Sequence, residues 1–157
     1  MSDIKKILFV CTGNSCRSVM AEALLKKYLK DSGKAQIEVR SAGTRALNGL
    51  PPTEETLEVL REEGITLSGF KSTSLTDQMI KDADLILAME DIHKDEILRR
   101  LPAVSPKIHL LREYGHTDQK YHDEGIGIPD PIGRPKEFYS YVMNSIKKEV
   151  ERIAKIL

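Results

Sequence analysis

Residues 5–18 read Lys-Lys-Ile-Leu-Phe-Val-Cys-Thr-Gly-Asn-Ser-Cys-Arg-Ser, and the architecture follows from this stretch. Ile7 to Val10 form a short apolar run, which is typical of a buried parallel strand. The amphipathic stretch from Val19 to Leu29 has helical spacing. A strand, a tight loop and a helix in this order predict an α/β fold. Cys11 then stands at the carboxyl edge of the sheet, where open α/β sheets bind their ligands.

The loop between the predicted strand and helix has the chemistry of an anion-binding site. Its backbone N–H groups and the positive end of the helix dipole attract phosphate-like groups, and Gly13 and Asn14 tolerate the positive φ that a tight curl requires. The same field favours the thiolate of Cys11, which is the nucleophilic form. Ser18 is placed to donate a hydrogen bond to that sulfur. Arg17 carries a planar guanidinium that can hold two phosphoryl oxygens.

The rest of the chain alternates predicted strands with predicted helices. Further strands are predicted at residues 37–41, 85–89 and 107–111, and further helices at 53–63, 75–83, 91–101 and 135–157. We therefore predict a three-layer α/β fold, with a four-stranded parallel sheet, helices on both faces and the phosphate loop after the first strand. The 157 residues are expected to form a single domain.

The composition is that of an ordinary globular chain, with 40% hydrophobic and 31% charged residues. The 24 basic residues balance the 24 acidic ones, so bulk charge indicates neither a nucleic-acid nor a membrane partner. The absence of a long apolar run and of a signal peptide predicts a cytoplasmic location. The two cysteines, Cys11 and Cys16, lie too close for a structural staple, which fits a reducing compartment. The spacing of the histidines predicts no metal site. They are His93, His109, His116 and His122.

Cys-x5-Arg-Ser directly after an amino-terminal strand, written here as Cys-Thr-Gly-Asn-Ser-Cys-Arg-Ser, resembles the active-site loop of the low-molecular-weight protein tyrosine phosphatases. The resemblance extends over nearly the whole chain. Residues 41–44, Ser-Ala-Gly-Thr, match the family's second loop, and a long loop over residues 112–133 ends near Asp130-Pro131, which matches the family's acid. Loops of this length in compact domains are usually functional or disordered.

The resemblance implies a metal-independent phosphoprotein phosphatase with no cofactor. Cys11 is then the nucleophile that forms a cysteinyl phosphate, Asp130 is the general acid and later the base, and Ser18 stabilises the departing thiolate. Arg17 binds the phosphoryl group together with the loop residues. These are Thr12, Gly13, Asn14, Ser15 and Cys16. The resemblance also implies that Ser41 hydrogen-bonds the loop through Asn14, and that a reversible disulfide between Cys11 and Cys16 protects the nucleophile from over-oxidation.

Several positions depart from the family's common pattern. Ile132 and Gly133 follow Asp-Pro, where phosphotyrosine enzymes commonly have aromatic residues, and Thr12 stands where leucine is common. Ser15 is similar to the bacterial protein-arginine phosphatases, which have threonine there. Phe70 replaces a buried histidine that many members link to the loop asparagine. We expect a phosphorylated protein as substrate, phosphotyrosine as the preferred residue and inorganic phosphate as product, with phosphoarginine as the alternative.

Two other functions fit less of the sequence. A thiol-dependent arsenate reductase shares the first loop, but it usually needs further cysteines for its disulfide relay, and this chain has two in all. A non-catalytic phosphopeptide-binding module would not need the acid Asp130. His93, near the start of a predicted helix, is expected to be solvated or to cap that helix rather than to take part in chemistry.

Overall fold

The structure is a computed structural model that describes residues 3–118 and 126–157. Its elements are β1 (Lys6–Cys11), α1 (Arg17–Asp31), β2 (Glu38–Gly43), α2 (Glu54–Glu62), α3 (Asp77–Asp82), β3 (Leu85–Ala88), α4 (Asp91–Arg100), the 3₁₀ helix η1 (Pro102–Lys107), β4 (Ile108–Leu110) and α5 (Lys136–Ala154). Strand and helix alternate along most of the chain, as the sequence predicts.

The four strands form one parallel sheet in the order β2-β1-β3-β4. The strand β1 lies inside the sheet, where Val10 is in register with Ala42 of β2 and with Ala88 of β3. Because a central parallel strand is covered on both faces, its apolar residues need not alternate with polar ones. Residues 7–11 of β1 are accordingly all buried.

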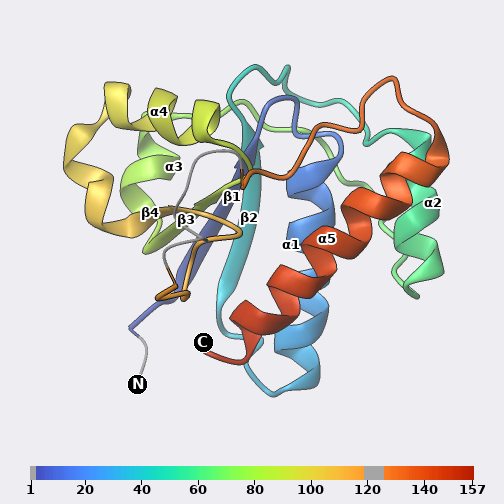
Figure 1. Ribbon diagram of the computed structural model, residues 1–157, viewed down its shortest axis with the longest axis horizontal. Coiled ribbons are helices and arrows are strands. Elements are labelled where there is room, and N and C mark those ends of the chain that lie inside the picture. The colour runs from blue at the N-terminus through green and yellow to red at the C-terminus, as the bar shows by residue number, and fades with distance from the viewer. Residues whose placement is uncertain (1–2, 119–125) are drawn as a thin grey trace.

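Helices cover both faces of the sheet (Figure 1). On one face α1 and α5 pack together with α2 beside them, and the core there includes Phe9, Leu24 and Ile146. On the other face α3 and α4 cover a second core that includes Leu8 and Ile97. The predicted three-layer α/β fold with a four-stranded parallel sheet is confirmed.

The predicted element bounds differ from the observed ones at a few ends. The helix predicted at 75–83 is the shorter α3, because the Thr76 side chain accepts a hydrogen bond from the backbone N–H of Met79 and so caps it. The strand predicted at 37–41 extends to Gly43. Part of the predicted loop at 112–133, with His122, lies outside the described residues. None of the helices in the described ranges is long and apolar enough to cross a membrane.

The fold places the first loop at the carboxyl edge of the sheet. Cys11 is the last residue of β1, Gly43 is the last residue of β2, and their backbones are in register. The chain leaves β3 at the same edge, because its last residue, Ala88, pairs with Val10. Residues that follow three parallel strands therefore meet around the loop at 12–16.

Candidate active site

The loop at 12–16 runs from the end of β1 to the start of α1. Cys16 is the N-cap residue of α1 and Arg17 is its first helical residue. Asn14 adopts a left-handed conformation, with φ of 52°, which asparagine tolerates better than most residues. The loop is tied to the segment after β2 by the N–H groups of Thr44 and Arg45, which donate to the carbonyl oxygens of Cys11 and Thr12, each at 2.9 Å.

Gly43 lies directly against this loop, and only glycine fits there. A Cβ atom at Gly43 would lie 2.4 Å from the Thr12 carbonyl oxygen and 2.9 Å from the Asn14 backbone nitrogen. Both distances are far below van der Waals contact. The second loop therefore supports the first one through the close approach of two backbones.

The Asn14 side chain holds the loop from the inside. Its Oδ1 accepts a hydrogen bond from the Thr73 N–H at 2.8 Å, and its Nδ2 donates to Ser18 Oγ at 2.8 Å and to Ser41 Oγ at 3.0 Å. Ser41 in turn donates to Glu22 at 2.7 Å. The Asn14 amide is thus bonded through both its oxygen and its nitrogen, and Phe70 takes no part in these hydrogen bonds.

The thiol of Cys11 is buried and contacts one hydroxyl group. Cys11 Sγ lies 2.9 Å from Ser18 Oγ. Because the Asn14 amide nitrogen can only donate to Ser18 Oγ, the hydrogen of the Ser18 hydroxyl is left for the sulfur. Ser18 therefore donates its hydrogen bond to the Cys11 sulfur.

Arg17 is the most deeply enclosed charge of the site, with 2% of its side chain exposed. Its Nη1 atom donates to the Glu90 carboxylate and, at 2.8 Å, to the carbonyl oxygen of Ile128. Its Nη2 atom lies 3.6 Å from Oδ2 of Asp130 and 3.4 Å from the Thr12 hydroxyl. One edge of the guanidinium is thus fixed by protein groups, while the Nη2 edge lies beside the loop and Asp130.

His93 is buried at the start of α4 and contacts the loop. Its Nδ1 atom accepts from the Glu90 backbone N–H at 3.1 Å, and its Nε2 atom lies 2.8 Å from Thr12 Oγ1. Burial, followed by the positive charge of Arg17, lowers the pKa of His93 to about 4. The expectation that this histidine caps the helix is confirmed; the expectation that it is solvated is wrong, because only 1% of it is exposed.

Asp130 comes from the segment before α5. Its Oδ1 accepts a hydrogen bond from the Ile132 N–H at 3.1 Å, which holds the carboxyl group against the backbone two residues later. Its other oxygen faces Arg17, and 45% of the side chain is exposed. A carboxyl group in this place can exchange protons with a bound substrate and with water.

The remaining predicted site residues belong to the loop itself. Ser15 and Gly13 are half-buried, and the Ser15 carbonyl accepts from Thr53 N–H at 3.2 Å. Cys16 is buried, with its sulfur 3.6 Å from the Tyr139 hydroxyl. Burial raises the pKa of that hydroxyl to about 12. Cys11 and Cys16 are both free thiols in this structure, so their reversible disulfide stays a prediction.

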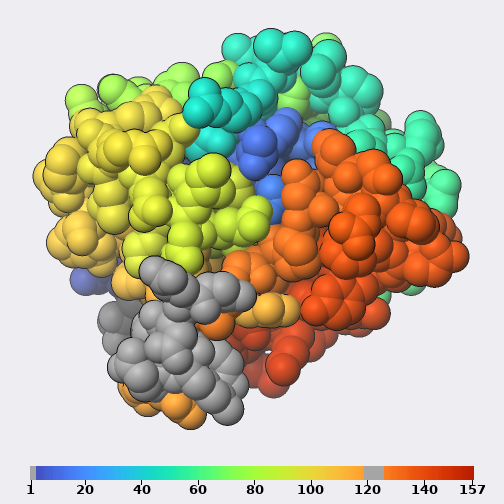
Figure 2. Space-filling view, turned by 45° about the horizontal axis from the view of Figure 1, so that its top comes forward, coloured from blue at the N-terminus to red at the C-terminus, as the bar shows by residue number. Residues whose placement is uncertain are grey.

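The loop is open to solvent between three segments of the chain. Figure 2 shows amino-terminal atoms, in blue, framed by the segment after β2 in cyan, the region of α4 in yellow-green and the segment before α5 in orange. A substrate can therefore approach from this side. Within residues 3–118 and 126–157, no group of three or more His, Cys, Asp or Glu side chains could hold a metal ion.

Sequence reasoning missed the partners of the arginine. Glu90 and the Ile128 carbonyl both bond Arg17, and neither was predicted as a site group. Glu90 follows the carboxyl end of β3, so its position at the ligand-binding edge was a usable signal. A backbone carbonyl such as that of Ile128 has no sequence signature.

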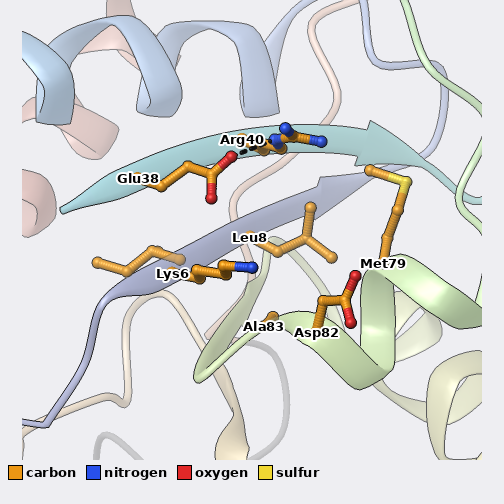
Figure 3. A pocket seen from close by; sticks show the side chains of 8 residues that line it. Lys6, Leu8, Glu38, Arg40, Met79, Asp82 and Ala83 are labelled. Atoms are coloured by element: carbon orange, nitrogen blue, oxygen red, sulfur yellow. Dashed lines mark hydrogen bonds and ion pairs between the residues drawn. The ribbon is translucent and has the colours of Figure 1, made fainter.

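A second hollow lies at the opposite, amino-terminal end of the strands (Figure 3). It has a volume of about 120 Å³, and its charged side chains are two cations and two anions: Lys6, Arg40, Glu38 and Asp82. Arg40 is paired with Glu38 at 2.8 Å. Because Lys6 begins β1 and Cys11 ends it, this hollow is separate from the loop.

A cysteine before a loop that leads into a helix, an arginine at the start of that helix and a carboxyl group facing that arginine are the arrangement expected of a cysteine-dependent phosphatase. The sequence agrees with this class over almost its full length. The family model described as Low molecular weight phosphotyrosine protein phosphatase matches residues 6–157, and the chain belongs to this family.

Named relatives of the chain fall into two groups. The Protein-arginine-phosphatase of Bacillus subtilis (strain 168) is 35% identical over 96% of this chain and 95% of the relative. The Low molecular weight protein-tyrosine-phosphatase Etp of Escherichia coli (strain K12) is 33% identical over 96% of this chain and 93% of the relative. A solved structure of the YwlE arginine phosphatase, a cysteine-to-serine mutant with a phosphorylated active-site serine, matches with a TM-score of 0.87 and 34% identity, covering 97% of this chain and 95% of that one.

Proposed function

We propose that this protein hydrolyses phosphotyrosine in phosphorylated proteins through a cysteinyl phosphate at Cys11. The observation that carries the proposal is the arrangement around Arg17. The guanidinium lies in the loop that begins at Cys11, and its Nη2 atom also faces Asp130 at 3.6 Å. Nucleophile, phosphate-binding cation and proton donor thus converge on one volume open to solvent.

In the first step, the Cys11 thiolate attacks phosphorus. The S–P bond forms while the bond between phosphorus and the tyrosine oxygen breaks, and Asp130 gives its proton to the leaving phenolate. The Nη2 edge of Arg17 and the backbone N–H groups of the loop bind the non-bridging oxygens. Those groups belong to Thr12, Gly13, Asn14, Ser15, Cys16 and Arg17.

In the second step, water attacks the cysteinyl phosphate. Asp130, now a carboxylate, takes a proton from the water as the O–P bond forms and the S–P bond breaks. Inorganic phosphate leaves, and Ser18 donates its hydrogen bond to the departing thiolate. Charge in such a transition state is spread over the phosphoryl oxygens, so positioning and electrostatics supply most of the rate enhancement. The scheme uses no metal and no cofactor.

Phosphoarginine is the second candidate substrate, and two observations favour it. The residue after Asp130-Pro131 is Ile132, which is 53% exposed and offers no aromatic ring to stack on a tyrosine. Loss of such stacking weakens binding by about 0.5–1.5 kcal/mol, too little to abolish hydrolysis of phosphotyrosine. In addition, Ser15 places a small hydroxyl group in the loop, as the arginine phosphatases do with threonine, and two relatives are named Protein-arginine-phosphatase.

The experiment is a kinetic comparison of two peptides that are identical except for phosphotyrosine or phosphoarginine at one position. We expect turnover of the phosphotyrosine peptide, none by Cys11→Ser, and no loss of rate in a metal chelator. A phosphorylated Cys11, trapped by acid quench and found by mass spectrometry, would identify the intermediate. A kcat/KM that favours phosphoarginine would select the alternative, and full activity of Cys11→Ser would overturn the mechanism.

We further infer a cytoplasmic location and neither a nucleic-acid nor a membrane partner. The balanced charge of the chain supports the second statement. The mechanism supports the cytoplasmic location, because it requires a reduced Cys11, and a reducing compartment keeps cysteines reduced.

A further inference from the structure

The hydroxyl group of Thr12 is approached by two nitrogen atoms. His93 Nε2 lies 2.8 Å from Thr12 Oγ1, and Arg17 Nη2 donates to the same oxygen at 3.4 Å. Thr12 follows the nucleophile directly and is half-buried. Its hydroxyl therefore lies beside the Nη2 edge of Arg17, to which the proposed function assigns the binding of phosphoryl oxygens.

The direction of the bond between His93 and Thr12 follows from the other side of the imidazole ring. The Glu90 backbone N–H can only donate, and its nitrogen lies 3.1 Å from His93 Nδ1, so Nδ1 carries no hydrogen. The ring is neutral at pH 7, because burial and the nearby Arg17 lower the pKa of His93. A neutral ring carries one N–H. That hydrogen is on Nε2, and it is donated to Thr12.

Both lone pairs of the Thr12 oxygen thus face donors, and its own hydrogen is left to donate. A similar chain of hydrogen bonds leads to Cys11, because Asn14 donates to Ser18 and Ser18 donates to Cys11. Two hydroxyl groups in the loop are therefore each oriented by an amide or imidazole donor behind them.

We propose that the Thr12 hydroxyl donates a hydrogen bond to a non-bridging oxygen of the phosphoryl group held over Cys11, and that His93 is a positioning residue that acts through Thr12. The inference rests on the proposed function and adds a side-chain donor to the ring of backbone N–H groups. A leucine at this position would offer no such donor.

The first test compares Thr12→Val, which removes the hydroxyl at nearly constant shape, with Thr12→Ser, which keeps it. Hydrogen bonds to charged groups are strong enough that Thr12→Val should lower kcat/KM by about 10-fold to 100-fold and weaken inhibition by orthovanadate and inorganic phosphate in parallel. Thr12→Ser should stay within about 3-fold of the wild type. Equal values for wild type and Thr12→Val, or equal losses in both variants, would overturn the proposal.

The second test asks whether His93 acts through Thr12. His93→Phe is measured in the wild type and in Thr12→Val, and we expect it to lower kcat/KM in the first background with little further effect in the second. An equal loss in both backgrounds would show a merely structural role. If His93→Phe does not fold, His93→Glu replaces it, because a glutamate at this helix position accepts from the Glu90 N–H but has no hydrogen to donate.

Failure of this inference can be told apart from failure of the proposed function. If the protein is not a phosphatase, the wild type turns over neither peptide. If only the inference is wrong, the wild type is active and Thr12→Val matches it. Binding of phosphate and vanadate, measured by calorimetry, tests the Thr12 donor in either case, since it needs no turnover.

Discussion

The Nη2 atom of Arg17 lies 3.6 Å from the Oδ2 atom of Asp130. A second bond joins the same two segments, because Arg17 Nη1 donates to the carbonyl of Ile128, two residues before Asp130. Arg17 therefore also fixes the segment that carries Asp130. We expect an anion bound by the loop and by Arg17 to lie beside the Asp130 carboxyl group, because that group faces the same Nη2 atom.

Replacing Asp130 by asparagine should separate proton transfer from attack by sulfur. Asp130→Asn keeps the shape of the side chain but cannot protonate a leaving group, so kcat for a phosphotyrosine peptide should fall by roughly 100-fold or more. An aryl phosphate whose nitrophenol leaves without a proton should be affected much less. Steady-state kinetics on both substrates make the measurement. An equal loss on both would show that Asp130 is not the acid.

Ser18→Ala should leave Cys11 a poorer nucleophile. The variant removes the only side-chain hydrogen bond recorded to the Cys11 sulfur within the described part of the chain. A hydrogen bond to a charged group is worth about 1.5–3 kcal/mol, so the loss of this bond should slow reaction at the Cys11 sulfur by at least about 10-fold. The measurement is the rate of Cys11 alkylation by iodoacetamide at pH 6, followed by mass spectrometry.

Ser41→Ala is the matched control for Ser18→Ala. Ser41 also accepts a hydrogen bond from the Asn14 amide, at 3.0 Å, but it does not contact the sulfur. Its loss should change the alkylation rate much less. If the two variants react alike, the effect comes from the Asn14 network and not from the hydroxyl beside Cys11.

Gly43→Ala should displace the phosphate loop. The new Cβ would lie 2.4 Å from the Thr12 carbonyl oxygen and 2.8 Å from the Ala46 side chain, so the two backbones must separate. A shift of the order of 1 Å in a catalytic loop can cost roughly 100-fold in rate, and we expect a loss of that size in kcat/KM. Gly64→Ala, at the end of α2 with φ of 78°, is strained but has room for the methyl group. It should lower stability and leave kcat/KM unchanged.

Local sequence patterns predict one part of the site but not the other. Cys11, Arg17 and Ser18 lie within one strand, loop and helix, so local spacing predicts that they meet. The groups that fix Arg17 are 73 and 111 residues away, namely Glu90 and the Ile128 carbonyl. No periodicity links them to the loop. Only the packing of β3 and of the segment before α5 against β1 brings them together.

The fold, like the site, is predicted by local sequence patterns only in part. Buried strands and amphipathic helices are encoded by local patterns, and their order predicts the parallel sheet. Element ends depend on single contacts, such as the Thr76 side chain that starts α3. The environment of His93 depends on tertiary burial, which a first-turn histidine in a charged helix does not reveal. Its contact with Thr12 spans 81 residues.

The buried His93 should make the protein less stable in mild acid. Its pKa is lowered from 6.5 to about 4 in the folded state, first by burial and then by Arg17. Between these two pKa values the unfolded chain therefore binds a proton at His93, whereas the folded chain does not. The stability that this neutral ring contributes is fully present above pH 6.5 and is lost as pH falls from 6.5 towards 4. Over that window the free energy of unfolding should decrease by about 3 kcal/mol from this group alone.

Comparison with His93→Gln isolates this effect from the carboxylates that titrate in the same range. Glutamine does not ionise, and at this helix position it can accept from the Glu90 N–H as the imidazole does. Urea unfolding at several pH values between 7 and 4 should show the wild type losing about 3 kcal/mol more than the variant over this range, with the difference concentrated below pH 6.5. Parallel curves would mean that His93 takes up a proton in the folded protein as readily as in the unfolded chain, and its Nδ1 atom would then no longer accept from the Glu90 N–H within the same range of pH.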